Sequence, residues 1–160
     1  MFQVNDGDRT LQFKGERLSH STSRSDEATR WVDFDLYRTE GGSYVVARTG
    51  YSRLYHVAGC QVVSKGRHSA AQVATLAQDS VPCELCKPDV TIDRAHELIY
   101  PERPLHWAQA CSTAEAAVEA LAKYDIDGNR YFTHVVRQLI RDAAKMDDDL
   151  RDAYYVEVIA

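Results

Sequence analysis

Residues 31–48 read WVDFDLYRTEGGSYVVAR, and this stretch decides the expected fold. Trp31, Asp33, Asp35 and Tyr37 point to one side of a strand if Val32, Phe34 and Leu36 point to the other, which is the pattern of a half-buried strand. Thr39-Glu40-Gly41-Gly42 supplies turn residues that tolerate positive φ, and a β-rich run resumes at Tyr44. The stretch therefore predicts an antiparallel hairpin from about Trp31 to Arg48.

Outward from this hairpin, the same alternation at Leu11 and Phe13 extends the antiparallel β region over residues 1–55. Helix signals follow in the rest of the chain. Ser69 is a candidate N-cap for an Ala-rich helix that ends near Gln78. Ser112 and Glu115 form the S-x-x-E pattern of a capping box, which predicts a helix to about Lys123.

Two further helices are expected after residue 130. Thr133 is a candidate N-cap for a helix with one apolar stripe, and Asp147 is a candidate N-cap for a short helix. The residues expected on the buried sides of these helices are Val136, Leu139, Ile140, Ala143, Leu150 and Ala153. Asp148 and Asp149 fit the first turn of the last helix, where the helix dipole favours acids.

The segment from Leu98 to Leu105 contains Pro101 and Pro104 and is interpreted as a connector. The expected fold class is α+β. The chain divides into an antiparallel β region over 1–55, a zinc-binding module over 56–97, and a helical region over 98–160 that packs on the rest. A helical region of this size has too small a core to be stable alone.

Composition excludes several classes of protein. The chain has 160 residues, 27% charged residues and a net charge of −5, which is typical of a folded domain rather than a disordered chain. Four cysteines are too few for a disulfide scaffold. No apolar run approaches the ~20 residues of a membrane span, and the N-terminus has no apolar signal segment. A cytoplasmic protein with reduced thiols and no membrane contact is expected.

Three of the cysteines and one histidine have the spacing of a metal site. The pattern is His56-x3-Cys60-x22-Cys83-x2-Cys86. Zinc takes four nitrogen or sulfur ligands, and a C-x2-C pair lets both sulfurs reach one ion at ~2.3 Å. The spacing and the intracellular context favour zinc over a disulfide or over incidental residues. The predicted cofactor is therefore Zn, held by His56, Cys60, Cys83 and Cys86.

The segment from about residue 52 to 89 resembles the Ada-type zinc domain, the N-terminal module of a methyl-phosphotriester repair protein. That family shows a Cys or His, x3, Cys, a helix-containing spacer, and then P-C-x2-C-x-P. Pro82, Cys83, Cys86 and Pro88 match its last part. The resemblance implies a small zinc-stabilised fold, in some relatives next to DNA.

One position departs from the repair protein. Its methyl-accepting cysteine corresponds to His56, and an imidazole cannot carry out that sulfur alkylation. Three thiolates and a neutral imidazole are typical of a closed structural site rather than a catalytic one. Methyl transfer is therefore not expected.

Charge is uneven along the chain, and no acidic residue occurs from Gly41 to Gln78. Basic side chains neutralise phosphates and tyrosine rings can stack on bases, so this window is a candidate nucleic-acid surface. A solvated basic strand edge is the alternative interpretation. The candidate residues are Arg48, Arg53, Lys65, Arg67 and Tyr51.

Other motifs favour structural interpretations. The loop Asp125-Ile126-Asp127-Gly128-Asn129 lacks the Gly and Glu that an EF-hand requires at its sixth and twelfth positions, and is expected to be a helix–helix turn. Cys111 lies near His106, but a lone cysteine here is expected to be a small core residue. The absence of a glycine-rich phosphate loop and of a nucleophile elbow lowers the expectation of an enzyme.

The predicted function is therefore binding rather than catalysis, with nucleic acid as the first partner. The alternative is a protein–protein effector or inhibitor from a phage or mobile element, which uses the acidic helical face to act on a host protein. Almost all of the net negative charge does lie beyond residue 100.

Overall fold

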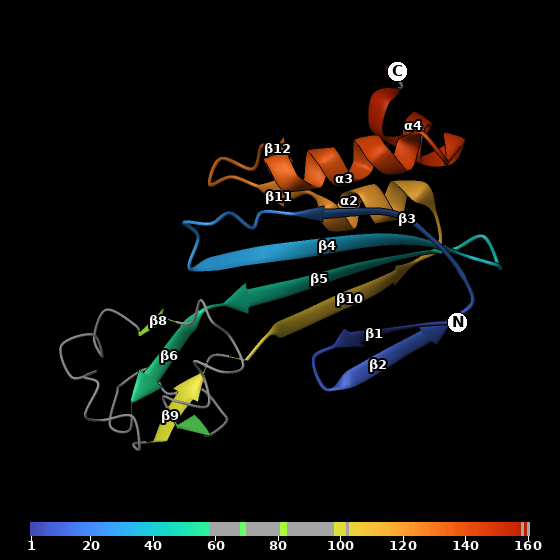
Figure 1. Cartoon of the computed structure of the whole chain (residues 1–160). Coiled ribbons are helices and arrows are strands. Elements are labelled where there is room, and N and C mark those ends of the chain that lie inside the picture. The colour runs from blue at the N-terminus through green and yellow to red at the C-terminus, as the bar shows by residue number, and fades with distance from the viewer. Residues whose placement is uncertain (58–67, 70–80, 83–97, 102, 158, 160) are drawn as a thin grey trace. The chain divides into compact units, whose positions relative to one another are not determined.

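The predicted hairpin is present as two long strands, β4 (Arg30–Thr39) and β5 (Tyr44–Ser52), in the computed structural model (Figure 1). Thr39 N donates to Ser43 O across the turn at 2.8 Å. Gly42 has φ of 82°, a conformation that glycine adopts without strain. The antiparallel hairpin predicted from about Trp31 to Arg48 is thus confirmed.

The structure describes residues 1–57, 68–69, 81–82, 98–101, 103–157 and 159. The chain divides into two units. Unit 1 contains Met1–Ser23, Val32–Thr49 and His106–Ala160, and unit 2 contains Arg24–Trp31 and Gly50–Leu105. The predicted α+β class with antiparallel sheets and C-terminal helices is confirmed.

A four-stranded sheet with the order β10-β5-β4-β3 forms the middle of unit 1. Its outer strands are β3 (Gly15–Thr22) and β10 (Leu105–Cys111). β3 pairs antiparallel with β4, with Gly15 opposite Thr39 and a register shift between Arg17 and Ser19. Gly15 is required there because a Cβ would lie 2.0 Å from Arg38 O.

Three helices cover one face of this sheet: α2 (Ala114–Leu121), α3 (His134–Ala144) and α4 (Asp148–Tyr155) (Figure 1). The even-numbered residues of β4 and β5 face them. The main core contains Phe34, Leu36, Tyr44, Val46, Val118, Leu121, Val136, Leu139, Ile140 and Leu150, among others. Among the described residues, no helix is long and apolar enough to cross a membrane.

The opposite face of the sheet carries a second, smaller core under the hairpin of β1 (Phe2–Asp6) and β2 (Arg9–Phe13). Tyr37 lies within 4.9 Å of the Phe2 ring and 5.2 Å of the Phe13 ring, centroid to centroid. The turn of this hairpin also bonds to the edge strand, because Gly7 N donates to His106 O at 2.9 Å. Both faces of the sheet are therefore covered.

The helix starts agree with the sequence at two of three positions. Asp147 caps α4 as predicted, and Thr133 precedes α3, although its side chain makes no capping hydrogen bond. The prediction that Ser112 caps α2 is wrong by one residue. Thr113 is the N-cap, because its backbone is extended and its hydroxyl accepts from Ala116 N at 3.1 Å.

Two predicted connections are strands instead. The expected connector from Leu98 to Leu105 contains β9 (Leu98–Pro101) and the first residue of β10. The expected helix–helix turn at residues 125–129 joins two short strands, β11 (Lys123–Tyr124) and β12 (Arg130–Tyr131). β9 pairs with β6 and β7, which lie far away in the sequence, so local turn residues do not reveal it. β11 and β12 pair with each other, but two residues per strand are too few to show an alternation.

Unit 2 has a second four-stranded sheet with the order β7-β9-β6-β8. Its strands are β6 (Leu54–Val57), β7 (His68–Ser69), β8 (Val81–Pro82) and β9. Ser69 belongs to β7, and the helix predicted after it, to about Gln78, lies outside the described residues.

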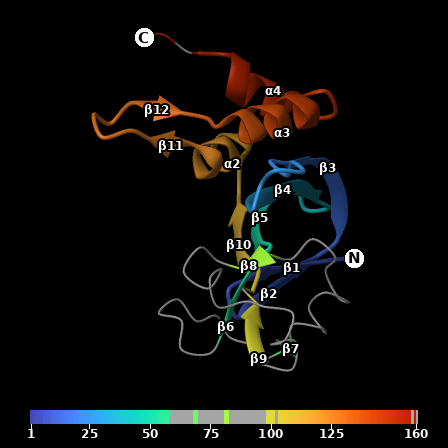
Figure 2. The same cartoon turned by 60° about the vertical axis from the view of Figure 1, so that its left-hand side comes forward.

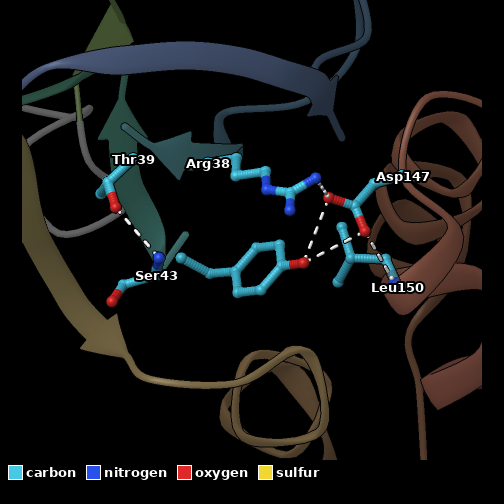
Figure 3. Close-up of polar contacts among 6 residues, drawn as sticks. Arg38, Thr39, Ser43, Asp147 and Leu150 are labelled. Atoms are coloured by element: carbon cyan, nitrogen blue, oxygen red, sulfur yellow. Dashed lines mark hydrogen bonds and ion pairs between the residues drawn. The ribbon is translucent and has the colours of Figure 1, made fainter. Parts of the chain in front are cut away.

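The buried carboxylate of Asp147 joins the sheet of unit 1 to its helices (Figure 3). It accepts from Tyr44 Oη at 3.1 Å, from Arg38 Nη1 at 3.1 Å and from Leu150 N at 3.0 Å. Burial, together with the hydrogen bond to this carboxylate, raises the pKa of Tyr44 to about 12, so its hydroxyl stays protonated and donates. A buried carboxylate is tolerated only when it is bonded in this way.

We predict that Asp147→Ala lowers the free energy of unfolding by about 2–4 kcal/mol, because it removes the α4 cap and leaves the buried Tyr44 hydroxyl without an acceptor. Tyr44→Phe is expected to cost about 1–3 kcal/mol. The matched control is Asp149→Ala, an exposed acid two residues away, expected to change stability by less than about 0.5 kcal/mol. Urea denaturation measures all three, and equal effects of the Asp147 and Asp149 variants would contradict the role of Asp147.

Candidate functional site

The metal-site prediction falls mostly outside the described residues. Cys60, Cys83 and Cys86 lie there, and His56 lies in β6. Within the described part of the chain, no three or more His, Cys, Asp and Glu side chains are placed to hold a metal ion. The four-ligand set therefore stays a prediction.

The strand pairing around His56 bears on that prediction. β6 runs parallel to β8, with Leu54 opposite Val81 and Tyr55 opposite Pro82. On its other side β6 pairs antiparallel with β9, with His56 opposite Tyr100. Tyr55, which precedes His56, is thus paired with Pro82, which precedes Cys83. The strand that contains His56 therefore lies beside the strand that ends just before Cys83.

The predicted nucleic-acid residues divide between the two units. Arg48 is exposed on β5 in unit 1, whereas Tyr51 and Arg53 belong to unit 2. Lys65 and Arg67 lie outside the described residues.

The guanidinium of Arg53 has a structural role within unit 2. It donates from Nη1 to Asp26 O at 2.8 Å and from Nη2 to Ser25 O at 3.2 Å. The backbone N–H of Arg53 also donates to Thr29 O at 2.9 Å. Arg53 therefore ties the segment Arg24–Trp31 to the chain that enters β6.

Tyr51 belongs to an aromatic and cationic cluster that also contains Trp31, Arg24 and Arg53. The Trp31 and Tyr51 rings stack with centroids 5.4 Å apart at an interplanar angle of 21°. The Cζ atoms of Arg24 and Arg53 lie 4.9 and 5.4 Å from the Trp31 ring centroid. Such contacts between a cation and an aromatic ring are attractive.

Sequence reasoning missed Arg24 and Trp31 as members of this cluster. For Trp31, the register of the predicted hairpin could have shown that it lies opposite Tyr51. Counting eight residues outward from the Thr39–Ser43 hydrogen bond reaches Trp31 on one strand and Tyr51 on the other. Arg24 gave no such signal, because it precedes β4 and reaches the ring only through the folded loop. Half-buried rings with guanidinium groups beside them suit stacking with a planar, anionic ligand such as a nucleotide.

Cys111 and His106 do not form a catalytic pair. They are five residues apart on β10, so their side chains leave opposite faces of the strand. The Cys111 thiol is buried in the main core, and burial raises its pKa, which keeps it protonated and unreactive. His106 Nδ1 lies 3.2 Å from Thr49 Oγ1. The prediction that Cys111 is a core residue is confirmed.

In comparisons with known proteins, no protein-family profile matches the sequence, and neither a curated protein nor a solved structure is significantly similar to the chain.

We predict that Arg53→Lys loosens the segment Arg24–Trp31, because a lysine keeps the charge but loses the two-pronged contact with Ser25 O and Asp26 O. Hydrogen exchange at the backbone amides of Ala28 and residue 53 should rise about tenfold, which corresponds to about 1.4 kcal/mol.

The matched control is Arg48→Lys, an exposed position that should leave exchange in this segment unchanged. Unchanged exchange in both variants would contradict the structural role of Arg53.

Proposed function

We propose that this protein is a non-enzymatic, zinc-stabilised binding protein that contacts nucleic acid through basic residues near the metal site. The observation that carries the proposal is the His56-x3-Cys60 and Cys83-x2-Cys86 spacing, supported by the pairing of the strand segments that precede His56 and Cys83. The resemblance of residues 52–89 to the Ada-type zinc domain is part of the same proposal.

The donor set fits zinc by its chemistry, since thiolate sulfur and imidazole nitrogen are the ligands that structural zinc sites use. His56, Cys60, Cys83 and Cys86 would hold the ion. Four protein ligands leave no position for a reactive water, so the zinc would supply folding free energy rather than catalysis.

The described strands of unit 2 favour such a clamp. β7 and β8 have two residues each, and β6 and β9 have four. Strands this short are marginal on their own, and small folds commonly depend on a metal or a disulfide. A zinc ion bound by His56 in β6 and by the cysteines that follow β6 and β8 in the sequence would compensate for the few strand hydrogen bonds.

The nucleic-acid part of the proposal rests on charge and aromatic rings. The window from Gly41 to Gln78 has no acid, and Lys65 and Arg67 lie between the predicted ligand pairs. Because the Arg53 guanidinium already bonds to two backbone carbonyls, we assign the phosphate contacts of unit 2 mainly to Lys65 and Arg67. Arg48, which is exposed in unit 1, is a separate candidate phosphate contact. Tyr51, stacked on Trp31, provides the aromatic surface.

The proposed zinc site predicts that the cysteines become reactive in two steps, first when a chelator removes the zinc and then when denaturant unfolds the chain. In the native protein a thiol reagent should modify none of the four cysteines, because three are bound to zinc and Cys111 is buried. A strong chelator should release three reactive thiols and one zinc per chain, and denaturant should release the fourth. Metal analysis and mass spectrometry of the modified protein measure these numbers.

The variant for this experiment is Cys83→Ser, which should lower the zinc content and destabilise unit 2. The control is Cys111→Ala, which should keep one zinc per chain. If the 160-residue chain, purified without any chelator, contains no zinc, the proposed metal site is wrong.

Nucleic-acid binding predicts a mobility shift that weakens steeply with salt. The double variant Lys65→Gln/Arg67→Gln should lower the slope of log K against log salt by about 1.5, because each lost phosphate contact removes about 0.7–0.9 from that slope. Lys14→Gln/Lys123→Gln is the matched control, since it removes two exposed charges from unit 1. Single- and double-stranded oligonucleotides of DNA and RNA are the probes.

Absence of any shift at low salt would overturn nucleic-acid binding. A host protein that binds the purified chain after nuclease treatment, in place of any oligonucleotide, would favour the protein–protein effector instead.

A further inference from the structure

Two side chains reach the Trp31 ring from the neighbouring segments of the chain. The register of the β4–β5 hairpin places Tyr51 opposite Trp31, and the two rings stack with centroids 5.4 Å apart. On the other side of β4, Ser23 N donates to Val32 O at 2.9 Å, which continues the antiparallel pairing of β3 with β4. One further step in this register places Arg24 opposite Trp31, and the Arg24 Cζ atom lies 4.9 Å from the ring centroid.

Arg24, Trp31 and Tyr51 therefore form a row, named the Trp31 stack below. β5 and β3 flank β4 on opposite sides, and β3 is an outer strand of its sheet (Figure 2). Tyr51 and Arg24 thus approach the Trp31 ring from opposite sides. The two rings are half-buried, whereas Arg24 is exposed. Arg24 is therefore the end of the stack that a ligand can reach.

Arg53 holds the segment that begins with Arg24. Its guanidinium donates to Ser25 O at 3.2 Å and to Asp26 O at 2.8 Å. Its backbone N–H donates to Thr29 O at 2.9 Å. These bonds fix the backbone next to Arg24, which lowers the entropy lost when a ligand stacks on the Arg24 guanidinium.

The chemistry of the stack favours a nucleobase over a phosphate group. A guanidinium plane stacks on the face of a base, and base stacking on side chains of this kind tolerates any sequence. Charge within residues 24–31 is balanced, because Arg24 and Arg30 accompany the exposed acids Asp26 and Glu27. Phosphates are therefore attracted only weakly to this segment, and a base face is the better ligand.

We propose, on the basis of the nucleic-acid binding proposed above, that the Trp31 stack selects a single strand by stacking one unpaired base on the exposed face of Arg24. Bases in a duplex are stacked on one another and paired, so their faces are closed to the Arg24 side chain. The phosphate contacts assigned to Lys65 and Arg67 serve single strands and duplexes alike. The stack therefore adds affinity for single strands alone.

The test measures binding of three probes of about 12 nucleotides to the 160-residue chain by fluorescence anisotropy at one low salt concentration. The probes are a single strand of mixed sequence, a duplex of the same sequence, and an abasic strand of the same length. The abasic strand keeps the phosphates of the single strand but has no base to stack. The single strand should therefore bind about tenfold more tightly than the abasic strand.

Arg24→Lys keeps the positive charge but removes the planar group that stacks. This variant should bind the single strand about tenfold more weakly and leave the affinities for the duplex and the abasic strand unchanged. Arg30→Lys is the matched control, because Arg30 precedes Trp31 in β4 and its side chain points to the opposite face of the strand. Both positions are exposed, so circular dichroism should show both variants folded.

The outcomes separate this proposal from the proposed function. If none of the three probes binds, nucleic-acid binding is wrong and stacking on Arg24 is overturned with it. If the single strand and the abasic strand bind equally well, nucleic-acid binding stands and stacking on Arg24 is overturned. The stacking is also overturned if Arg24→Lys binds the single strand as tightly as the wild-type chain does, or if it weakens binding of all three probes equally.

Discussion

The buried carboxylate of Asp147 is the constraint on which the arrangement of unit 1 depends. Among the described residues it is the only fully buried charged side chain, and it contacts β4, β5 and α4 at once. A carboxylate without partners in that position would cost several kcal/mol, so the strands and the helix are stable only when all three meet at one point. The contact therefore sets how α4, and with it the helical layer, lies on the sheet.

The two units are stabilised in different ways. Unit 1 has a sheet with apolar side chains on both faces, the helices over one and the β1–β2 hairpin over the other. The described strands of unit 2 are short, and their contacts include the Arg53 bonds to the segment that contains Trp31. This difference is the physical reason to expect that a metal matters for unit 2 and not for unit 1, since unit 1 buries a large apolar core of its own.

Local patterns predicted much of unit 1. The alternation from Trp31 to Tyr37 correctly separates Phe34 and Leu36, which face the helices, from Tyr37, which faces the β1–β2 hairpin. The apolar stripe of α3 and the cap of α4 were also predicted, because both depend on residues within one or two helical turns. The error at Ser112 occurs where two neighbouring residues can both cap, and the error at the segment 98–105 occurs where distant strands decide the pairing. The loop 125–129 is a turn as expected, but the strands that it joins have only two residues each, too few to show an alternation.

By itself the sequence determined the strand alternation, the cap of α4 by Asp147 and the His and Cys spacing on which the zinc proposal rests, since each needs only near neighbours. Only the tertiary structure decided which partners Asp147 has, because Tyr44 and Arg38 lie 103 and 109 residues away along the chain. It likewise decided that β6 lies between β8 and β9 and that Arg53 bonds to the 24–31 segment. Such contacts form only when segments that are far apart in the sequence pack together and bury their apolar surfaces. A local sequence pattern does not predict which segments will pack together.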